Sequence, residues 1–242
     1  MTQGAPMTLS VIVPVLNDAI HLRTLSQRLK NLPHIREIIV SDGGSKDEVE
    51  AVVGEFSLTL VSGARGRGSQ MNKGAETATG EILWFLHADT LPATNATESI
   101  LGAIRDPRTV GGAFRFHLAE PRWYGPLLNV AVNLRSKWFS MPYGDQGFFV
   151  RREVFERIGG FPDIPIMEDV EFLPRVKPEG DIALLDTPIE ISPRRWDREG
   201  FLKRTLLNWL LMLRWRRGAS PEDLLKFYRP GDVPPQESGL NS

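Results

Sequence analysis

The sequence has no cysteine in its 242 residues, and it has four histidines. Without cysteine, the chain can form no disulfide, no thiolate zinc site and no cysteine nucleophile, and it suits a reducing compartment. The histidines, at positions 21, 34, 87 and 117, lack the paired spacing of zinc ligands. A zinc hydrolase is therefore disfavoured.

An excess of positive charge and a long apolar run are also missing. The formal net charge is −1, whereas a general nucleic-acid-binding protein is usually strongly basic, so no nucleic-acid partner is predicted. No run approaches the roughly 20 apolar residues of a membrane-spanning helix. The first apolar run, residues 9–16, is short and interrupted by Pro14, which is typical of a strand and not of a signal peptide. We expect a cytoplasmic protein.

What the sequence does contain is an alternation of strand and helix patterns over residues 1–106. Short apolar runs, rich in β-branched residues, alternate with helical patterns, which predicts an α/β fold whose parallel sheet is covered by helices on both faces. Asn17-Asp18 is predicted to cap the first helix, and Ser45, with Glu48 three residues later, the second. The predicted strands are 9–17, 35–44, 58–63 and 81–89, and the predicted helices are 19–32, 46–56 and 69–78.

Two aspartates follow predicted strands at the edge where parallel sheets bind ligands. Asp42 and Asp89 both lie at carboxyl ends of strands. Asp42 either caps a helix or accepts hydrogen bonds from a nucleobase or ribose, which Gly43 and Gly44 would let approach closely. Asp89 either begins a turn or binds a divalent cation that grips a diphosphate. His87 shares its face of the strand and is either a packed histidine or a weak metal ligand.

A basic loop precedes the third predicted helix. Arg65 and Arg67 lie in a glycine-rich turn, which is either a solvated loop or a phosphate site at a helix N-terminus. The segment is not a dinucleotide fingerprint, because Met71 takes the position of the last glycine. It is not a P-loop either, because Lys73 precedes Gly74.

Two pairs of polar residues in the second half are further candidates. Glu168 and Asp169 either stabilise a helix N-terminus through the helix dipole or provide a general base for an acceptor hydroxyl. Asp145 and Gln146 either form a surface turn or hydrogen-bond a polyhydroxyl acceptor or sugar.

These motifs, in order, resemble those of family 2 glycosyltransferases of the GT-A fold. The segments that carry the resemblance are SVIVPVLND, EIIVSDGGSKDE, RGRGSQMNKGAETATGEILWFLHADT, YGDQGFFVRREVFERIGGF and MEDVEF. Within that family the chain is similar in particular to the small subgroup described as transferase 2, radical-SAM/selenodomain-associated, which is also similar to the mycofactocin glycosyltransferase. The resemblance runs from about residue 8 to about residue 229.

The resemblance implies a nucleotide-diphospho-sugar transferase fold with a mostly parallel central sheet flanked by helices and with C-terminal amphipathic helices. It implies a single domain over residues 1–229. Residues 1–106 would form the nucleotide-binding half, 107–196 the acceptor half and 197–229 the C-terminal helices. Residues 230–242, rich in proline, glycine and serine, are predicted to be a disordered tail.

The resemblance also implies roles for individual residues. The base and ribose of a nucleotide-diphosphate sugar would contact Val13, Pro14 and Asp42, and its diphosphate would lie beside Arg67 and Asn72. Asp89 would bind a divalent metal, Mg²⁺ or Mn²⁺, with His87 where the family has the first aspartate of its D-x-D motif. Asp169 matches the catalytic base of inverting members, with Glu168 beside it. Near the leaving diphosphate or the acceptor would lie Arg194, Arg195 and Trp196.

The predicted reaction is therefore transfer of a sugar from a nucleotide donor to an acceptor hydroxyl, with inversion. A nucleotidyltransferase on a related sheet is the first alternative, and it would release pyrophosphate. A non-catalytic sugar-nucleotide-binding protein, inactivated by the change at His87, is the second.

The C-terminal region is basic and rich in tryptophan. Residues 194–217 hold eight basic and two acidic side chains around an apolar stretch that is too short to span a bilayer. One interpretation is a helix that packs on the domain and exposes a basic rim. The other is an interfacial helix that brings the enzyme to anionic lipid at the inner face of the membrane, which would suit a lipid or lipid-linked acceptor.

Overall fold

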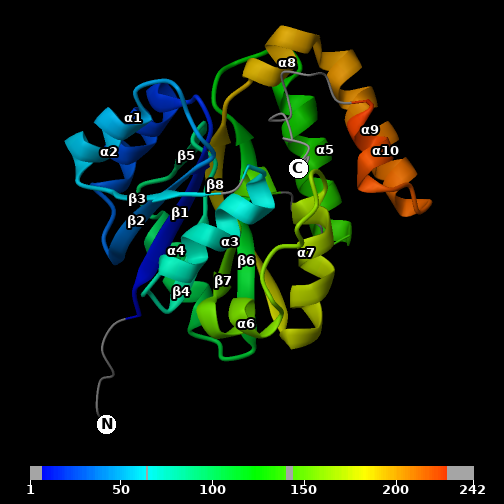
Figure 1. Cartoon of the computed structure of the whole chain (residues 1–242). Coiled ribbons are helices and arrows are strands. Elements are labelled where there is room, and N and C mark those ends of the chain that lie inside the picture. Colours follow the sequence, from blue (N-terminus) through cyan, green and yellow to red (C-terminus); the bar gives the residue numbers. More distant parts are fainter. Residues whose placement is uncertain (1–6, 64, 140–143, 228–242) are drawn as a thin grey trace, which may run out of the picture.

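The computed structural model describes residues 7–63, 65–139 and 144–227. They form a sheet with the strand order β3-β2-β1-β4-β7-β6-β8-β5, flanked by helices (Figure 1). The strands are β1 (Leu9–Val15), β2 (Ile35–Asp42), β3 (Thr59–Ser62), β4 (Ile82–Phe85), β5 (Thr90–Pro92), β6 (Thr109–Leu118), β7 (Phe149–Arg151) and β8 (Asp181–Ile191). The helices are α1 (Ala19–Leu29), α2 (Val49–Phe56), α3 (Arg67–Thr77), α4 (Ala96–Ile104), α5 (Gly125–Phe139), α6 (Arg152–Arg157), α7 (Glu168–Val176), α8 (Arg194–Glu199), α9 (Phe201–Arg216) and α10 (Pro221–Leu225), with short 3-10 helices at Gly144–Gln146 and Lys177–Glu179.

The sheet combines a parallel half with a mixed half. β2 is parallel to β1 and β3, and β1 is parallel to β4, as the alternating sequence pattern predicts. In the other half, β6 and β8 run parallel, while β7 is antiparallel to both β4 and β6 and β5 is antiparallel to β8. The carboxyl ends of β1, β2 and β4 therefore lie at one edge of the sheet, where ligands of such folds bind.

The predicted fourth strand is interrupted. It ends at Phe85 instead of residue 89, and the chain resumes as β5 at the far edge of the sheet. The amide of Leu86 still donates to the carbonyl of Ile12, and the amide of Thr90 then donates to the carbonyl of His87, 3.1 Å away. His87 and Asp89 consequently lie in a turn that links the middle of the sheet to its edge.

The core lies on both faces of the sheet, because the strand residues alternate between two clusters. Val11 and Val13 of β1 join the cluster under α1, α2, α4 and α5, whereas Ile12 joins the cluster under α3, α6 and α7. All three are fully buried. Two-sided burial explains why this strand reads as an unbroken apolar run instead of alternating with polar residues.

Pro14 lies in β1, although proline usually avoids central strands because it lacks an N–H group. The pairing of β1 with β4 reaches only Ile12 and Phe85, and β4 has ended opposite Pro14. The missing donor therefore costs no ladder bond on that side.

The two predicted helix caps are wrong. Asp18 precedes α1 but makes no capping bond, and the amide of Ala19 instead donates to the carboxylate of Asp47, 2.9 Å away. α2 begins at Val49, after Glu48, and no side chain caps it. The hydroxyl of Ser45 instead accepts from the amide of Asn17. Residues of the loop before α2 thus hold the start of α1.

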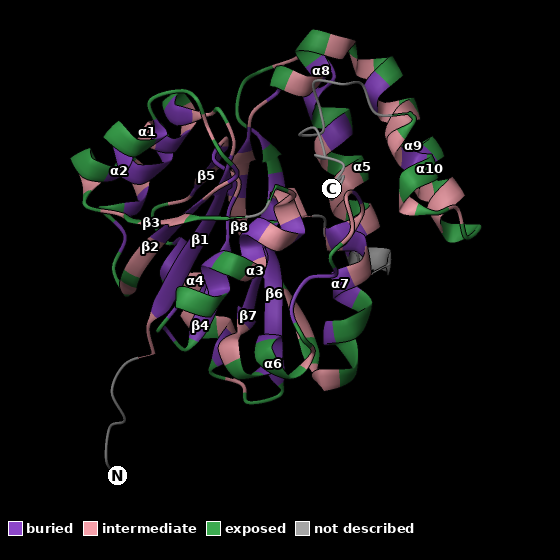
Figure 2. Ribbon diagram, in the orientation of Figure 1, coloured by how far each residue is buried: buried purple, intermediate pink, exposed green. Residues whose placement is uncertain are grey.

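The C-terminal helices turn away from the sheet, with α9 beside α10 at one end of the molecule (Figure 1). In α9 the buried residues are Arg204 and Leu211, and the rest of the helix is partly or fully exposed (Figure 2). In the part of the chain that the structure describes, no helix is both long and apolar enough to cross a membrane. The tail predicted at residues 230–242 lies outside the described residues.

Candidate active site

A hollow of about 110 Å³ lies between the start of α7 and one face of α9. Its lining combines predicted site residues with residues of the C-terminal helices. The predicted ones are Arg67, His87, Asp145, Glu168, Asp169 and Arg195. The others are Ile166, Met167, Val170, Arg204, Asn208, Leu211 and Met212.

Asp169 is fixed at the start of α7 by its backbone surroundings. Its Oδ2 atom accepts a hydrogen bond from the amide of Gly144, at 2.7 Å, and its Oδ1 atom accepts one from the amide of Val170, at 2.8 Å. Met167, two residues earlier, has a φ of 68°, a left-handed conformation that is uncommon for a residue other than glycine. Backbone strain of this kind is concentrated at functional sites.

The start of α3 packs closely against the start of α7. A Cβ atom at Gly68 would lie 2.8 Å from the carbonyl oxygen of Pro162, so only glycine fits there. The close approach lets Nε of Arg67 pair with Oε1 of Glu168 at 3.2 Å. Burial raises the pKa of the Glu168 carboxyl, and the Arg67 cation partly offsets that rise. Glu168 therefore anchors Arg67 beside the hollow and is itself buried.

His87 is held in its neutral form. The pKa of His87 is lowered to about 4, because burial and then the Arg67 cation lower it by more than the carboxylates of Asp89 and Asp169 raise it. Both carboxylates are therefore close enough to His87 to influence its ionisation. A neutral imidazole keeps a lone pair that can ligate a metal or accept a hydrogen bond.

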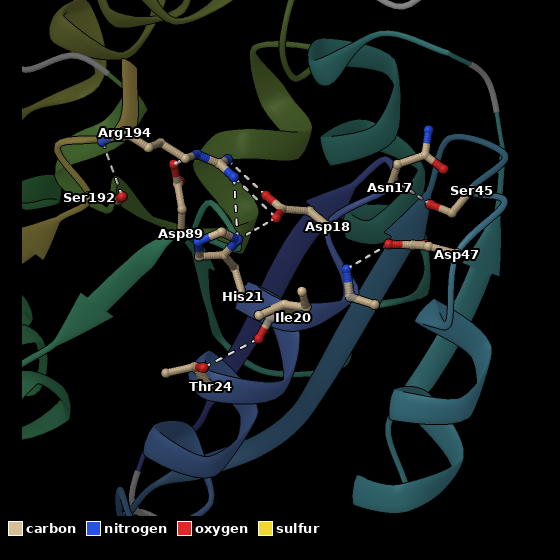
Figure 3. A network of polar contacts seen from close by, with 11 residues as sticks. Asn17, Asp18, Ile20, His21, Thr24, Ser45, Asp47, Asp89, Ser192 and Arg194 are labelled. Carbon is tan, nitrogen blue, oxygen red and sulfur yellow. Dashed lines mark hydrogen bonds and ion pairs between the residues drawn. The ribbon is translucent and has the colours of Figure 1, made fainter. Parts of the chain in front are cut away.

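Arg194 of α8 joins two aspartates that follow different strands, Asp18 after β1 and Asp89 after β4 (Figure 3). Its Nε atom lies 2.9 Å from Oδ2 of Asp89, and its Nη2 atom lies 2.8 Å from Oδ2 of Asp18. Asp18 also contacts His21 on the first turn of α1. Burial raises the pKa of Asp89, but neighbouring charged groups, the Arg194 cation foremost, together lower it more, and the net shift is downward. Asp89 is consequently an ionised carboxylate in a partly buried place.

Asp145 brings a second carboxyl group to the hollow. Burial raises its pKa to about 6, against an ordinary value of 3.8. Its Oδ1 atom is buried and has no hydrogen-bond partner among the described residues. A buried, unpaired carboxyl oxygen that lines a hollow is suited to a ligand hydroxyl, because such a group costs free energy while it stays unsatisfied.

Several predicted site residues are engaged within the protein instead of facing the hollow. The side-chain amide of Asn72 pairs with both the amide and the carbonyl of Phe161 at 2.8 Å. The amide of Gln146, which is fully buried, donates to the carbonyl of Phe114 and accepts from the hydroxyl of Ser136. Trp196 is buried against Phe116. In these contacts the three side chains organise the backbone and core around the site.

The predicted nucleoside-binding residues lie at the sheet edge, apart from the hollow. Val13 and Pro14 are buried within β1. The Asp42 carboxylate accepts from the amide of Ser45, 3.1 Å away, and so closes its own glycine turn. The three carboxylates of Asp42, Asp89 and Asp169 therefore do not line one hollow. Asp89 and Asp169 both influence the ionisation of His87, and Asp42 lies at the end of β2.

The residues fit a metal ion that is shared with a substrate. Among the residues that the structure describes, no group of three or more histidine, aspartate or glutamate side chains is placed to hold a metal by itself. Asp89 and the neutral His87 offer two donors. Magnesium sites commonly use one or two carboxylates and take their remaining ligands from substrate phosphates and water, so this set fits a metal bound together with a diphosphate.

Sequence reasoning missed four residues of this region. Asp18 was interpreted as a helix cap, and its place at the carboxyl end of β1 is the signal that favours a site role. Arg204 was counted in an exposed basic rim, yet it is buried, lies 3.4 Å from Glu199 and lines the hollow. Asn208 lines it from the same helix. Gln70, which had no assigned role, donates to the carbonyls at the ends of β1 and β2 and fastens α3 to the sheet edge.

The fold has solved counterparts among nucleotide-sugar transferases. A mannosyltransferase from Pyrobaculum calidifontis, in complex with GDP-Man and Mn²⁺, superposes with a TM-score of 0.62 at 23% identity, over 92% of this chain and 69% of that one. Glucosyl-3-phosphoglycerate synthase from Mycobacterium tuberculosis, in complex with Mn²⁺, UDP and glucosyl-3-phosphoglycerate, gives a TM-score of 0.60 at 18% identity, over 85% and 79% of the chains. The chain therefore has the GT-A fold.

Curated relatives agree with this fold. The probable glycosyltransferase YdaM of Bacillus subtilis is 27% identical over 237 residues, which is 86% of this chain but only 54% of YdaM. The uncharacterized glycosyltransferase Rv1514c of Mycobacterium tuberculosis is 30% identical over 200 residues, or 76% of this chain and 72% of the relative. This chain thus spans about half the length of YdaM and most of Rv1514c.

The family model for Glycosyl transferase family 2 matches residues 10–161. The match includes β1 to β4, the turn with His87 and Asp89, and the strand β7. It ends before Glu168 and Asp169, so the base assignment depends on the structure around α7. The narrower subgroup expected from the sequence stays a prediction. Since the matched segment is more than half of the sequence, the chain belongs to glycosyl transferase family 2.

Proposed function

We propose that this chain transfers a sugar from a nucleoside-diphosphate donor to an acceptor hydroxyl with inversion, and that Asp169 is the general base. The observation that carries the proposal is the placement of the Asp169 carboxylate in the wall of the hollow that also contains His87, Arg67 and Arg195. A base and several cations at one hollow match the two needs of the reaction, which are proton removal from the acceptor and charge stabilisation on the leaving group.

Proton removal requires a carboxylate that is ionised and correctly aimed. The amides of Gly144 and Val170 donate to the two oxygens of Asp169 and limit its rotation. As the acceptor oxygen forms its bond to the anomeric carbon, its proton passes to Asp169. The bond from that carbon to the diphosphate breaks on the opposite side, which inverts the anomeric centre.

The departing diphosphate gains negative charge, which the arginines are placed to stabilise. Arg67 and Arg195 line the hollow, and Arg194 lies beside them on the Asp89 side. A divalent ion, Mg²⁺ or Mn²⁺, held by Asp89 and assisted by the His87 ring, would supply further neutralisation of the leaving group. Arg194 already contacts Asp89, so a metal and Arg194 compete for this carboxylate.

The size of the hollow indicates how the donor would lie. At about 110 Å³ it is smaller than the roughly 300 Å³ at which small-molecule sites begin. The reacting end of the donor would occupy the hollow, and its nucleoside would follow the sheet edge past Asp89 towards Val13, Pro14 and Asp42. The free Oδ1 atom of Asp145 would accept a hydrogen bond from a hydroxyl of the sugar or the acceptor.

We infer that the acceptor is a lipid or a lipid-linked molecule. The inference is supported by α9, which lines the hollow on one side and exposes apolar side chains on the other. It would place the enzyme at the inner face of a membrane. Chemical identification of the product tests this inference.

The test compares product formation with donor binding in one variant. Donor sugars bearing different nucleotides are first screened by thermal shift with Mn²⁺ or Mg²⁺, since a donor that binds the folded state stabilises it. Asp169→Asn should reduce turnover about a thousandfold, which is typical of losing an essential acid–base group, and should leave the donor-induced thermal shift like that of wild type.

The products discriminate between the alternatives. Glycosyl transfer releases a nucleoside diphosphate, and NMR of the product should show an inverted anomeric centre. Release of pyrophosphate from a nucleoside triphosphate would instead support a nucleotidyltransferase. Near-normal turnover by the Asp169→Asn variant would show that another group is the base, and donor binding without turnover by the wild type with any acceptor would support a non-catalytic role.

A further inference from the structure

Helix α9 is poorly packed for its composition. Its sixteen residues include ten large apolar side chains, of which only Leu211 is buried. Leu206 and Trp209 are 75% and 73% exposed, and Leu202 and Leu213 lie on the same side of the helix. Their spacing of i, i+4, i+7 and i+11 makes one continuous stripe. An apolar stripe of this length normally packs against another surface, such as a partner protein or a lipid bilayer.

A second stripe with the same spacing lies on α5. Trp123, just before the helix, is 80% exposed, and Leu127, Val130 and Leu134 follow along one side. The two helices meet at their starts, where the rings of Trp123 and Phe201 are 5.6 Å apart. We call the two stripes together the apolar surface: Trp123, Leu127, Val130 and Leu134, with Leu202, Leu206, Trp209, Leu210 and Leu213.

The apolar surface and the hollow use opposite sides of α9. Successive residues of a helix turn by about 100° around its axis. Arg204, Asn208 and Leu211 consequently share one side, which lines the hollow. Leu206 and Trp209 lie on the other side, roughly half a turn away. Since the hollow-lining side is already in contact with the domain, the apolar stripe faces away from it.

The two helices that carry the apolar surface have charges of one sign. Neither α5 nor α9 contains an acidic residue, whereas α9 carries Lys203, Arg204, Arg214 and Arg216 and is followed by Arg217. Lys203 and Arg217 are exposed near its two ends. Exposed tryptophan, leucine and a basic rim are the features with which helices lie in the interface of anionic bilayers.

We propose that the apolar surface docks on an anionic lipid bilayer, with α9 and α5 lying in the interface and the basic residues contacting lipid head groups. A second copy of the chain is the other candidate occupant. In a symmetric dimer, however, α9 would pack against its own copy, and every charged side chain on both helices would be positive. Charge complementarity therefore favours the bilayer.

The test measures binding of the full-length chain to lipid vesicles by co-sedimentation. Vesicles contain phosphatidylcholine alone or with about a third phosphatidylglycerol, at low and high salt. We expect binding to the anionic vesicles that weakens as salt rises. Replacing Leu206 and Trp209 together by glutamate should weaken this binding at least about tenfold, since it removes apolar contact and adds repelled charge.

Matched variants distinguish an effect of the apolar surface from the effect of changing any exposed apolar residue. Ile20 of α1 is 78% exposed and lies outside the apolar surface, so Ile20→Glu should retain wild-type binding. Lys203→Ser and Arg217→Ser should each weaken binding about fivefold, which corresponds to the usual contribution of one basic residue near an anionic membrane. Leu127→Glu with Val130→Glu should show whether α5 takes part. Far-UV circular dichroism checks that each variant is folded.

The possible results are decisive in both directions. Docking is overturned if the wild type does not bind anionic vesicles, or if the Leu206→Glu, Trp209→Glu variant binds as well as wild type. Self-association in sedimentation, abolished by the same two substitutions without vesicle binding, would assign the surface to a second copy. The proposal is separate from sugar transfer, because the Asp169→Asn variant should bind vesicles like wild type.

Discussion

The amino-terminal half of the sheet and the segment 194–216 both supply charged groups to the site, but they are built differently. His87 and Asp89 follow β4, which is buried on both faces and hydrogen-bonded to β1 and β7. Arg194, Arg195 and Arg204 come from α8 and α9, and α9 buries two of its sixteen residues. His87 and Asp89 are thus held in place by the core. The three arginines are held by helices of an outer layer.

This difference indicates which part of the site can adapt. Local opening of a protein is easiest where few apolar groups are buried. α9 can therefore shift relative to the sheet at a lower free-energy cost than β1 or β4 can. The contact between Arg194 and Asp89 joins the two layers, and it is the contact that a bound metal would replace.

The largest predicted contrast concerns packing. Leu25 on α1 is fully buried, whereas Leu206 on α9 is exposed. Replacing each of them by alanine measures how much its layer contributes to the free energy of unfolding. Leu25→Ala should lower the free energy of unfolding by about 2–5 kcal/mol through lost burial and a cavity. Leu206→Ala should change it by less than about 0.5 kcal/mol. Urea denaturation measures both, and a comparable loss in the two variants would show that α9 is part of the core.

The next contrast concerns the ion pair between the partly exposed Arg67 of α3 and the buried Glu168 of α7. Arg67→Ala leaves the buried Glu168 carboxylate without its partner and should cost about 2–4 kcal/mol of stability. Adding Glu168→Gln should recover much of this loss, because the unpaired charge is removed. Thermal unfolding of the single and double variants is the measurement, and additive losses would contradict the pairing.

A smaller, pH-dependent effect is expected at Asp145. Its pKa of about 6 lies above the ordinary 3.8, so between these values the folded chain holds a proton that the unfolded chain has lost. The carboxyl's contribution to stability is therefore complete below about pH 4 and is lost as the pH rises through 6. Asp145→Asn, neutral at every pH, should be more stable than wild type by about 1–3 kcal/mol at pH 7.5 but not at pH 4. An equal gain at both values would refute the assignment.

The smallest effect is expected at the contact between the layers. Arg194→Gln removes the cation that pairs with Asp89. Without donor, Mn²⁺ should then bind about fivefold tighter, because a competing, partly exposed ion pair worth about 1 kcal/mol is lost. Electron paramagnetic resonance measures the Mn²⁺ affinity. Arg198→Gln is the control, since Arg198 pairs with Glu199 on α8. Unchanged Mn²⁺ affinity in the Arg194 variant would exclude competition at this carboxylate.

Local sequence patterns predicted the parallel half of the fold well. Continuous apolar runs with helices between them have few alternative arrangements, so β1 to β4 and the carboxyl edge followed from the sequence. The same patterns left His87, Asp169 and Arg67 as candidates, each with a purely structural alternative, and the resemblance to family 2 glycosyltransferases implied their roles. The structure brings these three to one hollow.

Contacts between distant segments were not accessible in this way. The pair Asp18 and Arg194 is separated by 176 positions, and the contact exists only because α8 folds over the end of β1. Amide side chains were also misleading, because Asn72 and Gln146 are as useful for satisfying buried backbone groups as for binding a sugar. The arginines of residues 194–217 differ in burial. Their burial depends on how α9 is rotated about its axis, and the count of basic residues does not show this rotation.

The turn that carries His87 and Asp89 runs directly into β5, a three-residue strand at the edge of the sheet with β8 as its partner. β5 has one hydrogen-bonded neighbour whereas β4 has two, so local opening of this turn would begin at its β5 end. Amide hydrogens of Leu91 should then exchange with solvent well before those of Ile12.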